Sequence, residues 1–393
     1  MDVIGHHING IATAGGSRRG PVFNPATGQQ IAEVAFADDV TCDAAIGAAA
    51  AAFDTWRHTS LATRATAMFA FREIMNSRKA ELAAVITQQH GKTLADALGE
   101  VTRGLEVVDF ACGIPHLAKG SFSENVSTNV DVYSIRQPVG VVGIISPFNF
   151  PAMVPLWFAP IAIACGNTVV LKPSEKDPGA SMLLAQWFAE AGVPSGVFNV
   201  LNGDKQAVDA LLTDKRVKAV SFVGSTPIAR YVYETGTSHG KRVQALGGAK
   251  NHMVVLPDAD LDLAADAAIN AGFGSAGERC MAISALVVVE PVADALVVKI
   301  VERLVRLRTG DGTRDVDMGP LITAEHRDRV AGYVQAGVDA GAVVVADGRG
   351  VDVQGDPAGF WLGPTLIDRV TPTMSVYTDE IFGPVLSVLR VNS

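Results

Sequence analysis

Cysteine is scarce in this sequence. It occurs only at positions 42, 112, 165 and 280, widely separated and with no CxxC pair. Such scattering argues against a disulfide framework, and no pair of histidines or cysteines has the spacing of a zinc site. We therefore expect free thiols in a reducing, cytoplasmic setting, and no metal centre.

The sequence also lacks a long apolar run and a surplus of basic residues. Its longest apolar stretch, "AMVPLWFAPIAIACG" (152–166), contains two internal prolines and is too short to span a bilayer. The N-terminus, "MDVIGHHING", has no basic-then-apolar signal pattern. A formal net charge of −9 argues against nucleic acid or anionic lipid as the main partner.

The overall composition is typical of an α/β protein with a large buried core. The chain has 393 residues, of which 48% are apolar and 19% charged, so more than one core is expected. From residue 139, apolar strands alternate with helix-length segments, as in a parallel sheet covered on both faces. These strands are "VGVVGIIS", "NTVVLKP", "GVFNVL", "KAVSFVG" and "RVQAL". A second series of the same kind begins after about residue 247.

The order of these patterns predicts two doubly wound parallel-sheet domains. Residues 1–36 fit an opening hairpin, and three segments with helical periodicity follow, at 38–57, 60–91 and 93–120. "NVDVYSIRQP" (129–138) alternates polar and apolar residues, as a half-exposed strand does. We expect a first domain built from 1–120 and 139–246, a β extension at 121–138, and a second domain at 247–393.

One cysteine lies in a distinctive stretch, "GSAGERCMAIS" (274–284), where Cys280 follows Arg279. A neighbouring cation favours the thiolate, the nucleophilic form of cysteine. The overlapping "GFGSAG" (272–277) matches the glycine pattern of dinucleotide folds, which needs a strand before it and a helix after it. Here a helical segment precedes and a strand-like segment follows. We therefore interpret it as a flexible loop that presents Cys280.

Better candidates for a nucleotide site follow the strands of the first domain. "VVLKPSEK" ends a buried strand with Lys172, Glu175 and Lys176, charges that can meet a ribose. "SFVGSTP" places Gly224 and Ser225 between a strand and a helix, where backbone N–H groups can hold a diphosphate. Each alone reads as an ordinary strand exit or helix cap, but the pair in one sheet favours a nucleotide.

The turn "ISPFNFP" (145–151) also follows a strand. Its Asn149 offers an amide donor in a proline-bounded turn, which could stabilise an oxyanion. By itself, an ordinary turn asparagine is the simpler interpretation.

Taken together, "SPFNFP", "LKPSE", "FVGST", "GERCM" and "DEIFGPV", in this order, resemble the aldehyde dehydrogenase superfamily over nearly the whole chain. "ALGGAKNH", "GERCMAIS" and "DMGPLIT" look like its CoA-acylating methylmalonate-semialdehyde dehydrogenase type. The resemblance implies a Rossmann-like NAD domain, a catalytic domain and a small β extension for oligomerisation. It further implies NAD as cofactor, CoA as co-substrate, and a homodimer or homotetramer.

By motif, the resemblance implies that Cys280 is the nucleophile and that Asn149, with the Cys280 backbone N–H, forms the oxyanion hole. It implies NAD contacts at Ser146, Phe148, Lys172, Glu175, Lys176, Gly224, Ser225, the backbone at Gly247, Glu380 and Phe382.

Two arginines would bind the carboxylate of an acidic semialdehyde. The resemblance implies that Arg279 and Arg103 share this task through paired hydrogen bonds. From the residues alone, a surface ion pair of Arg103 with Glu100 or Glu106 is the simpler interpretation.

A catalytic base is missing from "QALGGAKNH". Hydrolytic aldehyde dehydrogenases have a glutamate at the start of "LGG"; here that position is Ala245 or, aligned on "AKNH", Leu246. Water needs a base to cleave a thioester, whereas the CoA thiol ionises more readily. The pattern therefore favours CoA as acceptor, with Glu278 left as an alternative base.

The resemblance therefore predicts oxidation of methylmalonate or malonate semialdehyde with decarboxylation, giving propanoyl-CoA or acetyl-CoA. Two rival interpretations remain: a hydrolytic aldehyde dehydrogenase, and a non-catalytic nucleotide-binding member. The sequence stops at "FGPVLSVLRVNS", and the family's last motifs have no counterpart here. We therefore expect the C-terminal part of the family fold to be absent, and association to be weaker than in longer relatives.

Overall fold

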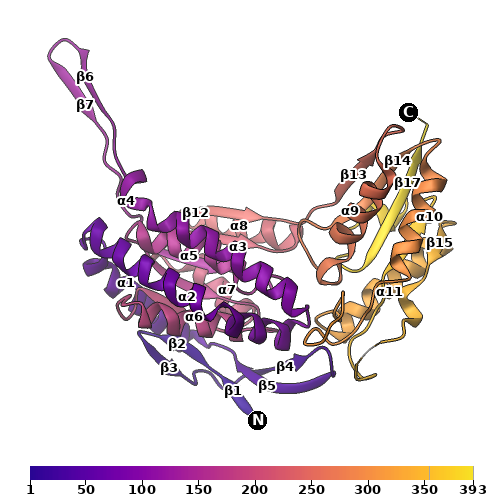
Figure 1. The fold of residues 1–393 in the computed structure, drawn as a ribbon. Helices are drawn as coiled ribbons and strands as arrows, with labels where there is room; N and C mark the ends of the chain where they lie inside the picture. Colours follow the sequence, from indigo (N-terminus) through magenta and orange to yellow (C-terminus); the bar gives the residue numbers. More distant parts are fainter. Residues whose placement is uncertain (354, 393) are drawn as a thin grey trace. The chain divides into compact units, whose positions relative to one another are not determined.

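The computed structural model describes residues 1–353 and 355–392 (Figure 1). The chain forms two compact units. The first comprises Met1–Val22, Ala32–Ala83 and Leu98–Gly247, and the second comprises Phe23–Ile31, Ala84–Ala97 and Gly248–Ser393. The second unit thus includes two segments that precede residue 247 in the chain.

A mostly parallel sheet forms the centre of the first unit. Its strand order is β12-β11-β8-β9-β10-β2-β3, and the first five of these strands are parallel. β8 and β9 are fully buried, because Val, Ile and Leu on both faces are covered. The strands are β2 (His6–Ile8), β3 (Ile11–Thr13), β8 (Val141–Ile145), β9 (Thr168–Lys172), β10 (Phe198–Val200), β11 (Val217–Val223) and β12 (Arg242–Leu246). The strands expected from 139 to 246 are confirmed.

Helices cover this sheet and pack against it. α1, α7 and α8 bury Ile46, Leu211 and Val232 in one core with residues of β8, β9 and β11. Asp38 caps α1, since its Oδ1 accepts from the Thr41 N–H at 2.8 Å. The helices preceding β12 are α1 (Asp39–Trp56), α2 (Leu61–His90), α3 (Leu94–Cys112), α4 (Ile114–Leu117), α5 (Met153–Ala164), α6 (Gly179–Glu190), α7 (Lys205–Thr213) and α8 (Thr226–Ser238). The three expected helical segments near the N-terminus are confirmed.

The N-terminal strands and a long hairpin complete this part of the chain. A three-stranded sheet has the order β1-β5-β4, from β1 (Asp2–Ile4), β4 (Arg19–Asn24) and β5 (Gln29–Ala35). β6 (Phe122–Ser127) and β7 (Val130–Tyr133) form an antiparallel pair in which every residue is exposed. A strand was expected at 129–138, and β7 lies there; only its expected half-exposure was wrong, because neither face of the β6–β7 hairpin is buried.

The second unit contains a sheet of its own, in the order β13-β14-β17-β16-β15. Its first four strands are parallel and β15 is antiparallel. The elements are β13 (Asn251–Val255), α9 (Leu261–Phe273), the 3-10 turn η1 (Gly274–Gly277), β14 (Ile283–Val289), α10 (Ala293–Leu304), α11 (Ala324–Asp339), β15 (Val343–Ala346), η2 (Gly348–Gly350), β16 (Thr365–Asp368), α12 (Ser375–Thr378) and β17 (Val385–Val391).

The core of the second unit lies between this sheet and its helices. Phe273, Leu296 and Val334 pack against Leu286 and Leu386 of the strands. Asp260 caps α9 and Thr323 caps α11. Within the described residues, no helix is long and apolar enough to cross a membrane.

Candidate active site

The carboxyl ends of β8, β9 and β11 lie at one edge of the first unit's sheet, because these neighbouring strands are parallel. β9 pairs with one side of β8 and β11 with the other, so the direction in which successive strands are added reverses at β8. Ligands of doubly wound sheets bind at such a switch point. The expected cofactor residues that follow these strands are Ser146, Phe148, Lys172, Glu175, Lys176, Gly224 and Ser225.

Charged residues gather after β9. Lys172 is buried, and its Nζ lies 3.1 Å from Oε2 of Glu175. Lys176 Nζ lies 5.3 Å from the ring centroid of Phe148, a cation–π distance. Burial works to raise the pKa of Glu175, but the charge of Lys172, a backbone hydrogen bond and the charge of Lys176 together lower it. Glu175 is thus an anion that can accept hydrogen bonds from ribose hydroxyls.

The start of α8 is exposed and carries no side-chain cap. Ser225 is the N-cap residue, and its hydroxyl makes no capping hydrogen bond. The Gly224 N–H donates to the Leu246 carbonyl at 3.1 Å, which fixes the turn before the helix. A Cβ added to Gly247 would lie 3.2 Å from Oγ1 of Thr226, so the glycine keeps space open beside the first turn. A helix start of this kind fits the diphosphate of NAD.

Ser146 and Asn149 are buried in the turn after β8, at 4% and 1% exposure. The Ser146 N–H donates to the Lys172 carbonyl at 3.1 Å and so ties this turn to β9. Oγ of Ser146 has no hydrogen-bond partner among the described residues, which is costly for a buried hydroxyl. A ligand hydroxyl bound at this edge would supply that partner.

Cys280 belongs to the second unit and lies at the edge formed by the amino ends of its parallel strands. β13, β14 and β17 are neighbouring parallel strands, so their amino ends share one edge of the sheet. Cys280 precedes β14, Lys250 precedes β13, and Glu380 precedes β17. The structure therefore brings the expected nucleophile and the expected ribose ligand to one edge, although they are 100 positions apart in the sequence.

The loop before Cys280 has an unusual backbone. Ser275, Ala276 and Gly277 all have positive φ, at 49°, 53° and 72°. Left-handed backbone is unfavourable for serine and alanine and persists only where neighbours hold it. Asp96 contributes, since its Oδ2 accepts from the Ser275 N–H at 3.2 Å. The expected loop is present, but it is buried and held, not flexible.

Asn251 fixes the backbone on the other side of the nucleophile. Its Nδ2 donates to the carbonyl oxygens of Cys280 and Ala282, both at 2.9 Å. Sequence reasoning missed this residue. The only signal was an amide at the start of a strand, which is common and has no specific meaning.

Glu380 accepts from the Ala249 N–H at 3.3 Å. Next to Ala249, Lys250 donates its Nζ to the carbonyl oxygens of Val376 and Asp379, at 2.9 and 2.8 Å. Burial lowers the pKa of Lys250 to about 8, although the charges of Asp379 and Glu380 oppose this. Lys250 was also missed by sequence reasoning, and it holds the segment that carries Glu380.

The chain matches known proteins over nearly its whole length. The sequence profile of the "Aldehyde dehydrogenase family" matches residues 12–393. The chain belongs to the aldehyde dehydrogenase family.

A malonate-semialdehyde dehydrogenase from Pseudomonas aeruginosa is 55% identical over 100% of this chain and 80% of that protein. The crystal structure of methylmalonate-semialdehyde dehydrogenase from Oceanimonas doudoroffii is 52% identical, with a TM-score of 0.99, and covers 100% of this chain and 81% of that one. A proposed methylmalonate-semialdehyde dehydrogenase from Sinorhizobium meliloti, complexed with NAD, has 50% identity and a TM-score of 0.98, with the same coverage.

In this aldehyde dehydrogenase, Glu278 is no accessible base. Its side chain is fully buried, and its Oε1 accepts from the Ile322 N–H at 3.2 Å. His90 and His326 face its two oxygens, at 3.6 and 3.4 Å. A fully buried carboxylate does not meet a water molecule in the substrate site. The alternative that Glu278 replaces the missing glutamate therefore loses its support.

Arg279 lines a cavity of about 550 Å³ within the second unit, together with Arg306 of the segment after α10. Neither guanidinium has an acidic partner among the described residues. Arg303 lines the same cavity but is paired with Asp262 and Asp266. Arg279 is thus available to an anionic ligand.

Arg103 lies on α3 in the first unit, where its side chain is 66% exposed. Its Nη1 lies 3.6 Å from Oε2 of Glu106, whereas the buried Glu100 accepts from the N–H groups of Ala152 and Met153. This is the surface ion pair that the residues alone suggest. The carboxylate-binding role of Arg103 stays a prediction.

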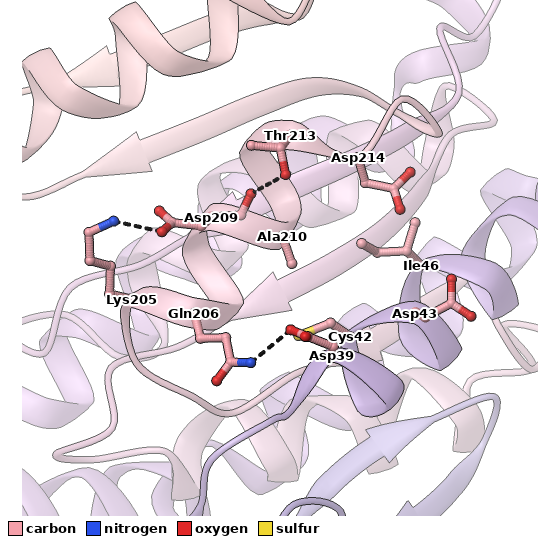
Figure 2. Close-up of a pocket in the computed structure, with 10 residues that line it drawn as sticks. All are labelled: Asp39, Cys42, Asp43, Ile46, Lys205, Gln206, Asp209, Ala210, Thr213 and Asp214. Atoms are coloured by element: carbon pink, nitrogen blue, oxygen red, sulfur yellow. Dashed lines mark hydrogen bonds and ion pairs between the residues drawn. The ribbon is translucent and has the colours of Figure 1, made fainter.

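A second cavity, of about 570 Å³, lies between α1 and α7 and is acidic (Figure 2). Each aspartate in it has a partner: for example, Asp209 binds Lys205 and Asp39 binds Gln206. Among the described residues, no cluster of histidine, cysteine, aspartate and glutamate could hold a metal ion.

Proposed function

We propose that the protein catalyses CoA-acylating oxidation of malonate semialdehyde or methylmalonate semialdehyde with NAD. The observation that carries the proposal is a nucleophile loop without a hydrolytic base. Cys280 is held in a fixed loop, position 245 or 246 bears no carboxylate, and Glu278 is sealed in the interior. A thioester on Cys280 then has no group to activate water, which favours the CoA thiol as acceptor.

Cys280 would act as the nucleophile toward the aldehyde carbon, and the Asn149 amide would stabilise the oxyanion that forms. The other three cysteines are poor competitors, because burial first of all raises the pKa of the Cys42, Cys112 and Cys165 thiols. For Cys42 the pKa reaches about 11. Only Cys280 lies in a loop that the family resemblance assigns to chemistry.

NAD fits the switch point of the first unit. Glu175 and Lys172 would bind a ribose, the start of α8 would hold the diphosphate, and Oγ of Ser146 would gain its missing partner. Glu380 and Phe382 of the second unit would contact the nicotinamide ribose and ring. When bound, NAD accepts the hydride released by the adduct on Cys280, which leaves an enzyme thioester.

The chemistry after oxidation follows from the substrate's carboxylate. It lies beta to the thioester carbonyl, which can accept the electron pair freed when CO2 departs, and a proton then completes the acyl group. Transfer to CoA breaks the bond to Cys280 Sγ and forms acetyl-CoA or propanoyl-CoA. Arg279, and Arg103 by resemblance, would orient the carboxylate before it leaves.

The β6–β7 hairpin is the proposed oligomerisation element. Its exposed apolar residues include Phe122, Val132 and Tyr133, at 65%, 51% and 74% exposure. Such residues on a two-stranded hairpin suit association with a second copy. We place the protein in the cytoplasm as a homodimer or homotetramer, a proposal that sedimentation at several concentrations would test.

The deciding experiment measures NADH formation from malonate semialdehyde, with and without CoA, for the wild type and for Cys280→Ser. CoA-dependent turnover that Cys280→Ser abolishes supports the proposal. Turnover without CoA would point instead to a hydrolytic enzyme. No turnover with NAD binding intact would favour the non-catalytic nucleotide-binding alternative.

A further inference from the structure

Four segments meet around Glu278 inside the second unit. They are the end of α2 with His90, the loop before Cys280, the segment leading into α11 with Ile322 and His326, and the segment before β17 with Phe382. Glu278 and His90 are completely buried, and His326 is 9% exposed. The Ile322 N–H donates to one carboxylate oxygen at 3.2 Å, and an imidazole nitrogen lies within 3.6 Å of each oxygen.

The ring protons of both histidines can be assigned from their partners. Nδ1 of His326 faces a guanidinium nitrogen of Arg329 at 3.1 Å and must accept, so the proton is on Nε2. Nε2 lies 2.6 Å from the Phe382 carbonyl and 3.4 Å from Oε1 of Glu278, both acceptors. In His90, Nδ1 accepts from the Lys92 N–H at 3.3 Å, so its Nε2–H faces Glu278. Both imidazoles are therefore neutral with the proton on Nε2; that of His326 donates to the Phe382 carbonyl, whereas Nε2 of His90 lies 3.6 Å from Glu278, beyond hydrogen-bonding distance.

The backbones of the two active-site loops also touch directly. A Cβ added to Gly277 would lie 2.2 Å from the Gly383 carbonyl oxygen, so only glycine fits where the loops meet. A Cβ added to Gly383 would lie 2.6 Å from Val330, which belongs to the same helix as His326. Phe382 has a φ of 58°, a left-handed conformation that needs support from its surroundings.

We propose that His326 is a positioning residue that couples the loop carrying Cys280 to the loop carrying Glu380 and Phe382. Its Nε2–H donates to the Phe382 carbonyl of the second loop, and the same nitrogen lies 3.4 Å from the Glu278 carboxylate of the first loop. The two loops then keep one fixed relative placement. For catalysis, this means that one imidazole fixes the positions of the Cys280 thiol and of Glu380, the expected ribose ligand, relative to each other. This consequence rests on the function proposed above.

The test compares His326→Ala, His326→Gln and Glu278→Gln with the wild type. Hydrogen–deuterium exchange is measured for peptides covering 274–282 and 376–384, with the rate of Cys280 alkylation by iodoacetamide and the dissociation constant of NAD. Glu325→Ala is the matched control, because Glu325 is an exposed neighbour on the same helix. None of these readouts requires semialdehyde or CoA.

For His326→Ala we expect faster exchange in both peptides, faster alkylation, and NAD binding weaker by roughly five- to tenfold, the effect of one lost hydrogen bond. His326→Gln retains an N–H donor and should restore most of each change. In the double variant His326→Ala/Glu278→Gln, each change should be smaller than the sum of the changes in the two single variants, because both substitutions remove the same contact.

Exchange that changes in only one peptide would overturn the proposal, as would a lower melting temperature with both loops unchanged. If His326→Ala does not fold, Glu278→Gln decides by the same criteria, because it removes the carboxylate charge at the other end of the contact. A wild type that binds no NAD would defeat the proposed function, while exchange in the two peptides would still decide the coupling.

Discussion

Lys172 Nζ and Glu175 Oε2 lie 3.1 Å apart at the carboxyl end of β9. The lysine is buried, while the glutamate remains partly accessible, with 39% of its side chain exposed. The pair therefore places an anion at the point where a ribose of the dinucleotide is expected. A 2′-phosphate at that position would meet the carboxylate.

Replacing Glu175 should relax the choice between NAD and NADP. Glu175→Gln keeps the size of the side chain and removes its charge. The affinity for NADP should rise by about tenfold or more, because repulsion between charges about 5 Å apart costs a few kcal/mol near a protein surface. NAD should bind more weakly, because the amide is a poorer acceptor for ribose hydroxyls.

Titration of both dinucleotides against Glu175→Gln and the wild type checks this. Glu234→Gln is the matched control, an exposed glutamate on α8. An unchanged ratio of NADP to NAD affinity would remove Glu175 from the ribose site.

Arg279 should decide specificity for an acidic substrate. Arg279→Gln is expected to raise the KM for malonate semialdehyde by roughly tenfold or more, because a hydrogen bond to a charged group contributes about 1.5–3 kcal/mol. Turnover of propanal, which has no carboxylate, should change little. Equal losses for both aldehydes would mean that Arg279 supports the loop and does not bind substrate.

The partner of Arg279 can be identified with the same two substrates. Arg103→Gln should reproduce the selective loss if the family resemblance holds. Arg306→Gln should reproduce it if the second arginine of the cavity binds the carboxylate instead. A loss confined to one variant assigns the role.

The elements and site residues that depend on nearby sequence could mostly be predicted. β8 and β9 were recognisable because both faces are buried, so Val, Ile and Leu run without interruption. Cys280 and Glu175 follow from motifs that stand at element ends. A β extension was expected at 121–138, but the bounds of β6 could not be read from the sequence, because all its residues are exposed and burial leaves no pattern.

The Glu278 centre could not be predicted for a different reason. His90, Glu278 and His326 are far apart in the chain, and only Glu278 belongs to a recognised motif, "GERCM". Their meeting depends on the inclusion in the second unit of Ala84–Ala97, which precedes the rest of the Glu278 centre by about 180 positions and is separated from it by most of the first unit. Long-range packing of this kind is invisible to periodicity.

The missing base can be restored by substitution. Leu246 is 40% exposed, whereas Ala245 packs toward the core of the first unit. Leu246→Glu should therefore raise NADH formation in the absence of CoA by at least about tenfold, since a general base contributes roughly 10²–10⁴-fold. Leu246→Gln has the same shape without a base and should show no gain. A gain from Ala245→Glu instead would favour the alignment on "LGG".

Acid should destabilise the first unit through His6. Burial, followed by the charge of Arg19, lowers its pKa to about 4 from the ordinary 6.5, although Asp38 opposes this. Its Nδ1 accepts from the Asn202 N–H at 3.0 Å, so the native imidazole is neutral. Below pH 6.5 the His6 side chain binds a proton in the unfolded chain but not in the folded chain. The contribution of His6 to the free energy of unfolding is therefore fully present above pH 6.5 and is lost as the pH falls toward 4.

The loss should be measurable by urea unfolding at pH 7.5 and pH 5. Linkage gives about 2 kcal/mol of lost unfolding free energy at pH 5 from this one group. The glutamine of His6→Gln can still accept from the Asn202 N–H but cannot be protonated. Between pH 7.5 and pH 5 the unfolding free energy of this variant should therefore fall by about 2 kcal/mol less than that of the wild type. His116→Gln, an exposed histidine on α4, should follow the wild type. Tryptophan fluorescence suits the measurement, because Trp56, Trp157 and Trp187 all lie in the first unit. If His6→Gln and the wild type lose stability in parallel, the pKa of His6 in the folded protein equals its value in the unfolded chain, and acid sensitivity comes from other groups.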